Sequence, residues 1–228
     1  MHHRQSISAL AILSAIALPF LSHAETKTVP LEPLSNLSLR NVTAESVTFK
    51  GRAAIRITAA GAADLPDGAR WAIVKGTDFQ DGVIEVDLTG DTVPGAPPTS
   101  RGFTGIAFRV APEGASYECF YLRPKNGRAE DQEQRNHSTQ YMAFPDFPWI
   151  KLRQESPSKY ESYVDLVPGE WTKVKIDVRG GKGRLYVNGA EQPALIVNGL
   201  KHAESKGAIA LWIGPGSVAH FSNLRITQ

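Results

Sequence analysis

The first residues that could do chemistry are two carboxylates in one short apolar segment. Glu85 and Asp87 stand two positions apart, and their immediate neighbours are apolar. In a β-strand such residues project from the same face, about 7 Å apart. Two carboxylates at this separation could serve as the acid and the nucleophile or base of glycoside hydrolysis. The structural alternative is a pair of solvated acids on a strand face.

A second group combines arginine and tyrosine on two strands that are predicted to be neighbours. Arg109 lies near the end of one strand, and Tyr121 and Arg123 lie near the end of the next. All three are predicted on the face opposite the core. A tyrosine ring can stack on a pyranose, and a guanidinium donates in-plane hydrogen bonds to hydroxyls or a carboxylate. The pattern favours sugar recognition, with cross-strand pairing to Glu85 and Asp87 as the alternative.

The most polar part of the chain, residues 123–141, gathers further donors and acceptors. His137 could act as a general base and Tyr141 as an acid, although a loop histidine that is merely solvated is the alternative. Trp149, between prolines, and Trp212, on a strand face with small residues, are candidate stacking platforms, with core packing the alternative for Trp212. The remaining candidate binding residues of the polar segment are Arg135, Asn136, Gln140 and Tyr141.

A glycine-rich hairpin organises the elements that must position these side chains. Residues 169–189 alternate apolar and polar side chains on both sides of Gly180, Gly181 and Gly183. Glycine supplies the positive φ values that a tight reversal needs. Similar short alternating segments recur along the chain, separated by turns and by the proline-rich loop 89–101. The pattern predicts an all-β protein, a two-sheet antiparallel jelly-roll sandwich without helices of two turns or more.

The chain divides into three predicted segments. Residues 1–24 combine Arg4, an apolar run shorter than the roughly 20 residues of a membrane span, and small residues up to Ala24. This is the pattern of a signal peptide cleaved after Ala24, so the mature protein is predicted to be periplasmic or extracellular. Residues 25–40 are predicted as an extended lead-in and 41–228 as a single domain. No later segment is apolar enough to span a membrane.

Composition restricts the partners. The 228 residues are 42% hydrophobic and 21% charged, with a formal net charge of +2. Basic and acidic residues are interspersed, so no nucleic-acid-binding stripe is expected. The single cysteine, Cys119, excludes an intramolecular disulfide and is predicted to be a buried side chain rather than a nucleophile. The histidines are too scattered for a zinc motif. The oligomeric state is left open.

Several segments resemble the concanavalin A-like lectin/glucanase superfamily. The first is GEWTKVKIDVRGGKGRLYVNG at 169–189, and the second is KGAIALWIGPGSVAHFSNLRI at 206–226. FQDGVIEVDL at 79–88 resembles an early strand of the same domains. The chain looks most similar to laminin-G-like and 3-keto-disaccharide hydrolase domains of secreted bacterial proteins. This resemblance implies a jelly roll whose concave sheet and rim loops meet carbohydrate.

The resemblance also bears on catalysis and on metals. Glucanases of this superfamily place three acids on one strand as E-x-D-x-x-E or E-x-D-x-E. Here Glu85 and Asp87 are followed by Gly90 where the third acid of the longer motif should stand, which argues against that mechanism. Laminin-G-like relatives often hold calcium at the rim, so calcium is the cofactor that the resemblance allows. The acids that could contribute are Asp78, Asp81, Asp91, Glu130 and Asp131.

Three functions stay open at this point. The first is an exported domain that binds a glycan across its concave sheet through Arg109, Tyr121, Arg123 and the loop around His137. The second is an enzyme, a glycoside hydrolase of the 3-keto-glycoside type or a polysaccharide lyase, using the same groove with His137, Glu85 or Asp87 as acid or base. The third is a non-catalytic protein-interaction module of the cell envelope.

Overall fold

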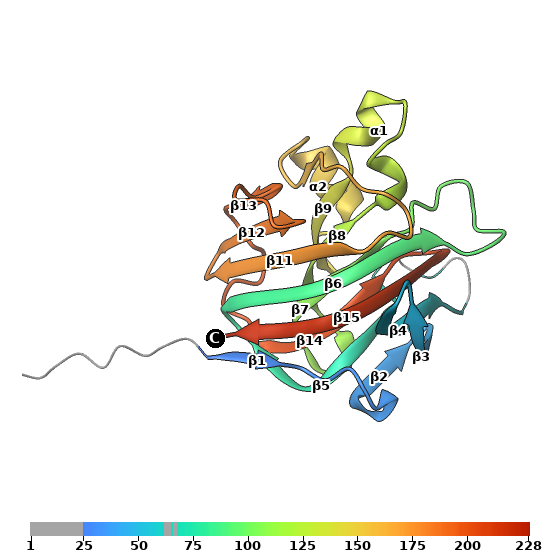
Figure 1. The fold of residues 1–228 in the computed structure, drawn as a ribbon. Coiled ribbons are helices and arrows are strands. Elements are labelled where there is room, and N and C mark those ends of the chain that lie inside the picture. Colours follow the sequence, from blue (N-terminus) through green and yellow to red (C-terminus); the bar gives the residue numbers. More distant parts are fainter. Residues whose placement is uncertain (1–24, 62–64, 66–67) are drawn as a thin grey trace, which may run out of the picture.

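Two antiparallel sheets make up the protein in the computed structural model, which describes residues 25–61, 65 and 68–228 (Figure 1). We call them sheet A and sheet B. In spatial order, sheet A consists of β13 (Leu195–Val197), β12 (Lys182–Val187), β11 (Thr172–Arg179), β6 (Gly82–Thr92), β15 (Ser217–Thr227), β4 (Arg52–Ala59) and β3 (Val42–Phe49), with β1 (Thr26–Thr28) also paired to β15. Sheet B consists of β10 (Glu161–Ser162), β9 (Thr139–Phe144), β8 (Tyr117–Leu122), β7 (Thr104–Val110), β14 (Gly207–Ile213), β5 (Trp71–Phe79) and β2 (Leu37–Arg40).

The predicted hairpin forms β11 and β12. Val174 pairs with Val187 and Ile176 with Leu185, and all four side chains are buried. β11 also pairs with β6, so the hairpin joins the centre of sheet A. The two-sheet sandwich predicted from this alternation is confirmed.

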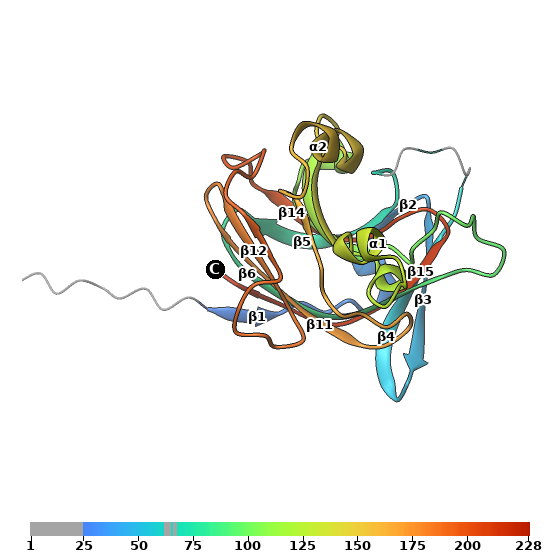
Figure 2. The same ribbon diagram turned by 90° about the horizontal axis from the view of Figure 1, so that it is seen from above.

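The core lies between the sheets. Ile84, Val86 and Leu88 of β6 are buried in it, as are Phe108 and Phe120 of sheet B. The layers approach each other closely at Gly183 of β12, where an added Cβ would lie 2.8 Å from the Phe120 ring. Figure 2 shows the two layers from above, with β5 and β14 in one layer and β6 and β11 in the other.

Short helices connect some of the strands. They are α1 (Gln132–Asn136) and α2 (Trp149–Glu155), together with the 3₁₀ turns η1 (Leu34–Asn36), η2 (Pro112–Gly114) and η3 (Pro124–Asn126). α2 packs on β9 and lies on the outer side of sheet B (Figure 2). The sequence did not predict α2, because Trp149 was assigned to a loop. The helix begins directly after Pro148, which is its N-cap residue.

The predicted lead-in, residues 25–40, contributes a strand to each sheet, because β1 pairs with β15 and β2 with β5. The predicted signal peptide, residues 1–24, lies outside the described residues. Among the residues that are described, no helix is long and apolar enough to cross a membrane.

Candidate functional site

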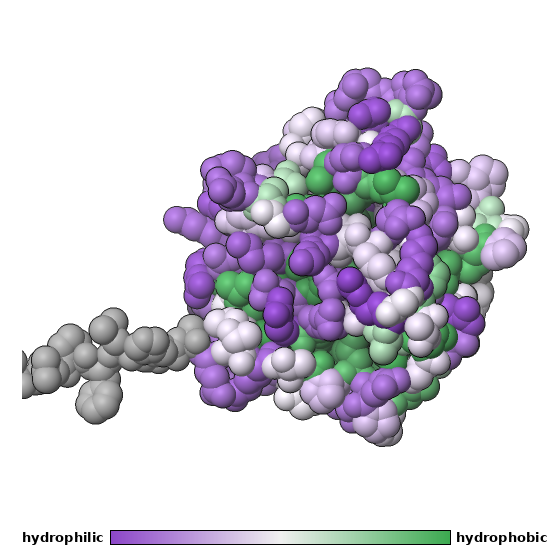
Figure 3. All heavy atoms as spheres, viewed as in Figure 1, coloured by the Kyte–Doolittle hydropathy of each residue, from purple (hydrophilic) through white to green (hydrophobic). Residues whose placement is uncertain are grey.

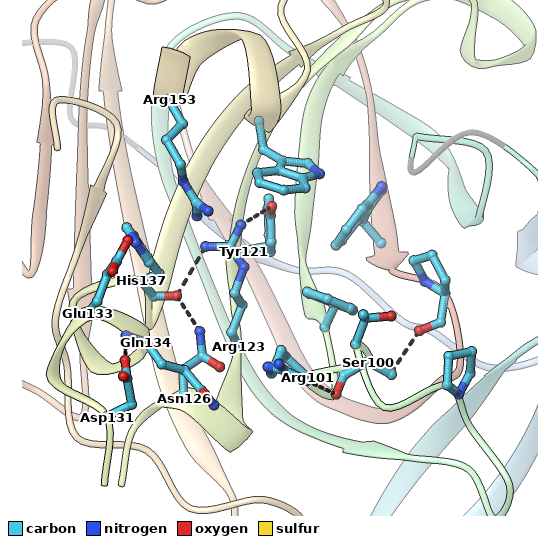
Figure 4. Close-up of a pocket in the computed structure, with 16 residues that line it drawn as sticks. Ser100, Arg101, Tyr121, Arg123, Asn126, Asp131, Glu133, Gln134, His137 and Arg153 are labelled. Atoms are coloured by element: carbon cyan, nitrogen blue, oxygen red, sulfur yellow. Dashed lines mark hydrogen bonds between the residues drawn. The ribbon is translucent and has the colours of Figure 1, made fainter. Parts of the chain in front are cut away.

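A pocket of about 490 Å³ opens on the outer face of sheet B (Figure 4). β8 and β14 form its floor, the proline-rich loop 93–101 forms one wall, and the segment from η3 through α1 together with the start of α2 forms the other. Pockets that bind small ligands commonly have volumes of about 300–1,000 Å³ and combine apolar walls with a few polar groups. This pocket has both kinds of lining.

The floor of the pocket is aromatic, and its two rings meet above a glycine. Gly105 of β7 pairs with Tyr121 on one side and with Trp212 on the other. A Cβ on Gly105 would lie 2.5 Å from Cβ of Tyr121, so a larger residue would separate the two neighbours. Because Gly105 has no Cβ, the Tyr121 and Trp212 rings approach to 4.7 Å between centroids. Trp212 is fixed further by donating from Nε1 to the hydroxyl of Tyr117, 3.1 Å away.

The charged wall centres on Glu161, the first residue of β10. Its carboxylate accepts three hydrogen bonds from Arg153, from Nε to the two oxygens at 2.9 and 3.2 Å and from Nη2 at 2.7 Å. Nδ1 of His137 lies 2.9 Å from the same carboxylate, and Nη1 of Arg123 lies 3.7 Å from it. The Glu161 side chain is 3% exposed. Two guanidinium groups therefore face one carboxylate, which leaves a surplus positive charge beside His137.

His137 is held neutral at neutral pH. Burial lowers its pKa below the ordinary value, and the charges of Arg153 and Arg123 lower it further, against the opposing effect of Glu161. Nδ1 faces Glu161, so the other ring nitrogen, Nε2, is turned away from that carboxylate. A neutral imidazole that lines a pocket can accept a proton from a ligand.

Arg123 connects the charged wall to the floor. It donates to the backbone oxygen of His137 at 3.0 Å, to the hydroxyl of Tyr121 at 2.9 Å and to Oε1 of Gln140 at 3.1 Å. The guanidinium carbons of Arg123 and Arg153 lie 5.5 and 4.7 Å from the Trp149 ring centroid. Cation–π contacts of this kind orient the indole at the pocket wall.

The wall that carries His137 is fastened at several points. Asn126 donates to the backbone oxygen of His137, 3.0 Å away, and Oδ1 of Asp131 caps α1 by accepting from the backbone of Gln134 at 2.6 Å. The segment after β10 runs along the same wall, with Asp165 bound to Arg128 through two hydrogen bonds of 2.7 and 2.8 Å. Such contacts preform the pocket.

The structure brings most of the predicted binding residues together. Tyr121, Arg123, His137, Trp149 and Trp212 all line the pocket. Gln140 is fully buried beside it and joins it through Arg123. Arg135 and Asn136 do not line it: Arg135 donates to the hydroxyl of Tyr163 at 3.0 Å, and Asn136 accepts from Gln132 at 2.8 Å.

The prediction that Arg109 shares the face of Tyr121 is wrong. Arg109 has φ 52°, and the pairing of β7 with β14 shifts register at this end of the strand. The side chain is fully buried and donates to Glu118 at 2.7 Å and to Asp81 at 3.0 Å. A β-bulge of this kind resets the alternation on which the prediction depended.

Tyr141 is also in the interior rather than in the pocket. It pairs with Phe120, a core residue, and its hydroxyl donates to Oε1 of Glu118 at 2.5 Å. Burial, reinforced by Glu118, raises the pKa of Tyr141 far above its usual value. The placement therefore contradicts both predictions for Tyr141, that it binds a ligand in the groove and that it acts there as an acid.

Glu85 and Asp87 lie on the outer face of sheet A, away from the pocket. Asp87 binds Arg52 at 2.8 Å and accepts from Asn223 at 2.7 Å, and Glu85 lies 3.7 Å from Arg225. Figure 3 shows this face as largely hydrophilic with apolar patches between the polar side chains. The predicted use of these acids in the same groove as His137 is contradicted by their position.

The acids suggested for calcium do not gather. Among the described residues no group of three or more acidic, histidine or cysteine side chains could hold a metal ion. Asp78 pairs with Lys206, Asp81 with Arg109 at 3.0 Å and Asp91 with Lys125 at 3.7 Å. Asp131 is the cap of α1, and Glu130 is exposed directly before it. Cys119 is buried in β8, and burial raises its thiol pKa.

Sequence reasoning missed Glu161, Arg153 and Asn126. Glu161 and Arg153 are eight positions apart and meet because the chain reverses after α2. One local signal was present: Trp149 and Arg153 are spaced i, i+4, the spacing at which two side chains share one face of a helix.

The family model of the 3-keto-alpha-glucoside-1,2-lyase-like domain matches residues 44–227. The chain belongs to this family. The resemblance to 3-keto-disaccharide hydrolase domains is thereby confirmed, and the domain is related to carbohydrate-active proteins. The comparison with curated proteins found no match.

Solved structures support the fold. The carbohydrate-binding module CBM66 from Bacillus subtilis is 14% identical, with a TM-score of 0.54 over 91% of this chain and 99% of that chain. A Bacillus subtilis protein described as having a galectin-like fold is 13% identical, with a TM-score of 0.52 over 91% of this chain and 97% of that chain. At these identities the likeness concerns the jelly-roll fold alone.

Proposed function

We propose that the pocket of sheet B binds a 3-keto-α-glucoside and that His137 removes the proton at C2, in an elimination that expels the substituent at C1. The family name supplies the substrate class. The observation that carries the proposal is the wall itself: a neutral histidine, 2.9 Å from a buried carboxylate and flanked by two arginines, lines the pocket.

The chemistry matches this wall. A ketone at C3 makes the C2–H bond acidic, so a base of modest strength can break it. The proton passes to Nε2 of His137, and the electron pair moves onto the C3 oxygen as an enolate. Arg123 and Arg153 provide the surplus positive charge that stabilises a developing oxyanion.

In the second half of the reaction, the negative charge passes from the enolate to the leaving oxygen. The enolate electrons form the C1–C2 double bond, the C1–O bond breaks, and the leaving oxygen takes up a proton from protonated His137 or from water. The products are a 2-hydroxy-3-keto-glucal and the free alcohol. The half-buried indole of Trp149 at the wall suits the apolar face of the sugar ring, whereas Tyr121 and Trp212, each 2% exposed, form the base of the pocket beneath it.

The test uses methyl 3-keto-α-glucoside and the purified protein. We expect release of methanol together with an enone product, and in deuterated water we expect exchange of the C2 proton, both followed by nuclear magnetic resonance. His137→Ala should lower the rate of both by about 100-fold or more. Its matched control is His202→Ala, a histidine that does not line the pocket. Elimination at the wild-type rate by His137→Ala would refute the assignment of the base.

Sugar recognition without turnover is the second candidate. It is supported by the aromatic and arginine lining of the pocket and by the fold shared with the binding module CBM66. In this case calorimetry would detect binding of the unoxidised α-glucoside and of the 3-keto-α-glucoside, with neither C2 exchange nor alcohol release. Exchange of the C2 proton that is lost in His137→Ala would favour the enzyme over recognition without turnover.

Both functions fit the predicted export of the chain. We propose that residues 1–24 are removed outside the cytoplasm. N-terminal sequencing of the mature protein should return Glu25 as the first residue, and an intact Met1 in the exported fraction would contradict this.

A further inference from the structure

A second hollow adjoins the sugar pocket. Its volume is about 730 Å³, and it shares Pro97, Ser100, Arg101 and Gln134 with the first. Figure 4 shows Ser100 and Arg101 on the loop side and Gln134 on the α1 side of this junction. The two spaces therefore form one continuous groove between the proline-rich loop and α1.

The second hollow differs in its chemistry. None of its described lining residues is aromatic, whereas the first pocket contains several aromatic rings. Its charged groups include Asp91 and Lys125, whose Oδ1 and Nζ atoms are 3.7 Å apart. This distance is too long for a direct hydrogen bond, so both groups retain capacity to bind ligand hydroxyls. Both side chains are partly exposed, 43% and 41%.

The hollow has a fixed frame. The backbone of Val93 donates to Gly216 at 3.0 Å, and Oγ of Ser100 donates to Pro215 at 2.9 Å, which fastens the loop to the turn before β15. The backbone of Lys125 donates to Arg101 at 3.2 Å, which fastens η3 to the same loop. A ligand would meet walls that are already in position.

We infer that the second hollow is the subsite for the leaving group, and that it selects leaving groups rich in hydroxyls, such as a second sugar or a polyol, over aromatic ones. This inference rests on the proposed function of the first pocket. With the 3-keto ring in the first pocket, the C1 substituent extends past Gln134 and Arg101 to the carboxylate and ammonium of Asp91 and Lys125. An aromatic leaving group would find no ring there to stack on.

The experiment compares two substrates that differ only in the leaving group: methyl 3-keto-α-glucoside and a 3-keto-α-glucosyl glucose. Asp91→Ala and Lys125→Met should each lower kcat/KM for the disaccharide by about 10-fold, the effect of losing one charged hydrogen bond. For the methyl glycoside the loss should be at least five-fold smaller. Lys206→Met, which removes an exposed lysine outside both spaces, is the matched control.

The outcomes separate the subsite from the chemistry. Equal losses on both substrates, or no loss on the disaccharide, would overturn the subsite. If wild-type protein eliminates neither substrate, the proposed reaction fails, and calorimetric Kd values for the same two compounds test the subsite alone. A 10-fold weaker Kd of Asp91→Ala and Lys125→Met for the disaccharide then supports it, and unchanged Kd values overturn it.

Discussion

Nδ1 of His137 lies 2.9 Å from Oε2 of Glu161, and the carboxylate of Glu161 is at the same time held by three hydrogen bonds from Arg153. The carboxylate therefore lies beside Nδ1, and the other ring nitrogen is turned away from it. Neither residue is near the other in sequence. Their contact depends on the return of the chain through α2 to β10, which pairs with β9.

Glu161→Gln should lower kcat at least 10-fold, because the imidazole loses the negative charge that stabilises its protonated form. Glu161 raises the pKa of His137, so its removal lowers that pKa further. The base must be neutral to act, so the acid limb of the pH–rate profile should move to lower pH. Asp165→Asn, which breaks an exposed pair with Arg128, is the control and should leave this limb in place. An unchanged limb in Glu161→Gln would remove Glu161 from the mechanism.

Trp149→Ala should weaken sugar binding by about 10-fold, because the indole lines the pocket and lies against the guanidinium groups of Arg123 and Arg153. Trp149→Phe should recover part of the affinity. Trp171→Ala is the matched control, since Trp171 packs against Phe49 and Arg52 at sheet A instead. The measurement is the calorimetric Kd for the 3-keto-α-glucoside. Equal Kd values for wild type and Trp149→Ala would exclude a role of Trp149 in binding.

Strand alternation predicted the fold and part of the site. It placed Tyr121 on the outer face of β8 correctly, because β8 is regular there, and it placed Arg123, the residue after β8, on the same side. It failed at Arg109, since the positive φ there interrupts the alternation. Tyr141 was misplaced for another reason: its face depends on the register of β9 against β8, which sequence alone does not contain. Glu161 belongs to the site only through a tertiary contact, which no local pattern could predict.

Gly105→Ala should destabilise the protein by about 2–3 kcal/mol and disrupt the pocket floor. The new Cβ would lie 2.3 Å from the backbone oxygen of Phe120 and 2.5 Å from Cβ of Tyr121, so backbone must move. Gly199→Ala is the control, because nothing lies within 4 Å of its Cβ. Urea unfolding of the two variants measures the difference. Equal stability of the two would show that β7 and β8 can separate at no cost.

Stability should fall with acid because of His220. Its ring stacks on Phe49 at 3.7 Å, and burial, with a contribution from Arg56, lowers its pKa to about 4. The unfolded value is about 6.5, so the unfolded chain binds the proton more tightly. The folded protein therefore has its full stability above pH ~6.5, where His220 is neutral in both states, and loses stability as the pH falls toward 4.

His220→Gln should flatten that loss by about 1–2 kcal/mol between pH 7 and pH 4.5, after solvent screening. The stability of this variant at pH 8 provides the reference, because removal of the ring also costs packing against Phe49. Unfolding free energies from urea titrations at each pH make the comparison. A wild-type slope as shallow as that of His220→Gln would contradict a lowered pKa.

Arg109→Met should destabilise the fold while sparing the sugar pocket. The side chains of Arg109 and Glu118 are both fully buried, 2.7 Å apart, and Arg109 also donates to the backbone of Gly180 at 2.9 Å. Removal of one partner leaves a buried charge, which costs about 3–5 kcal/mol. The double variant Arg109→Met/Glu118→Gln should regain part of this loss, because the unpaired carboxylate is gone. Folded Arg109→Met should bind the 3-keto-α-glucoside within two-fold of wild type, and a 10-fold weaker Kd at full folding would instead connect Arg109 to the site.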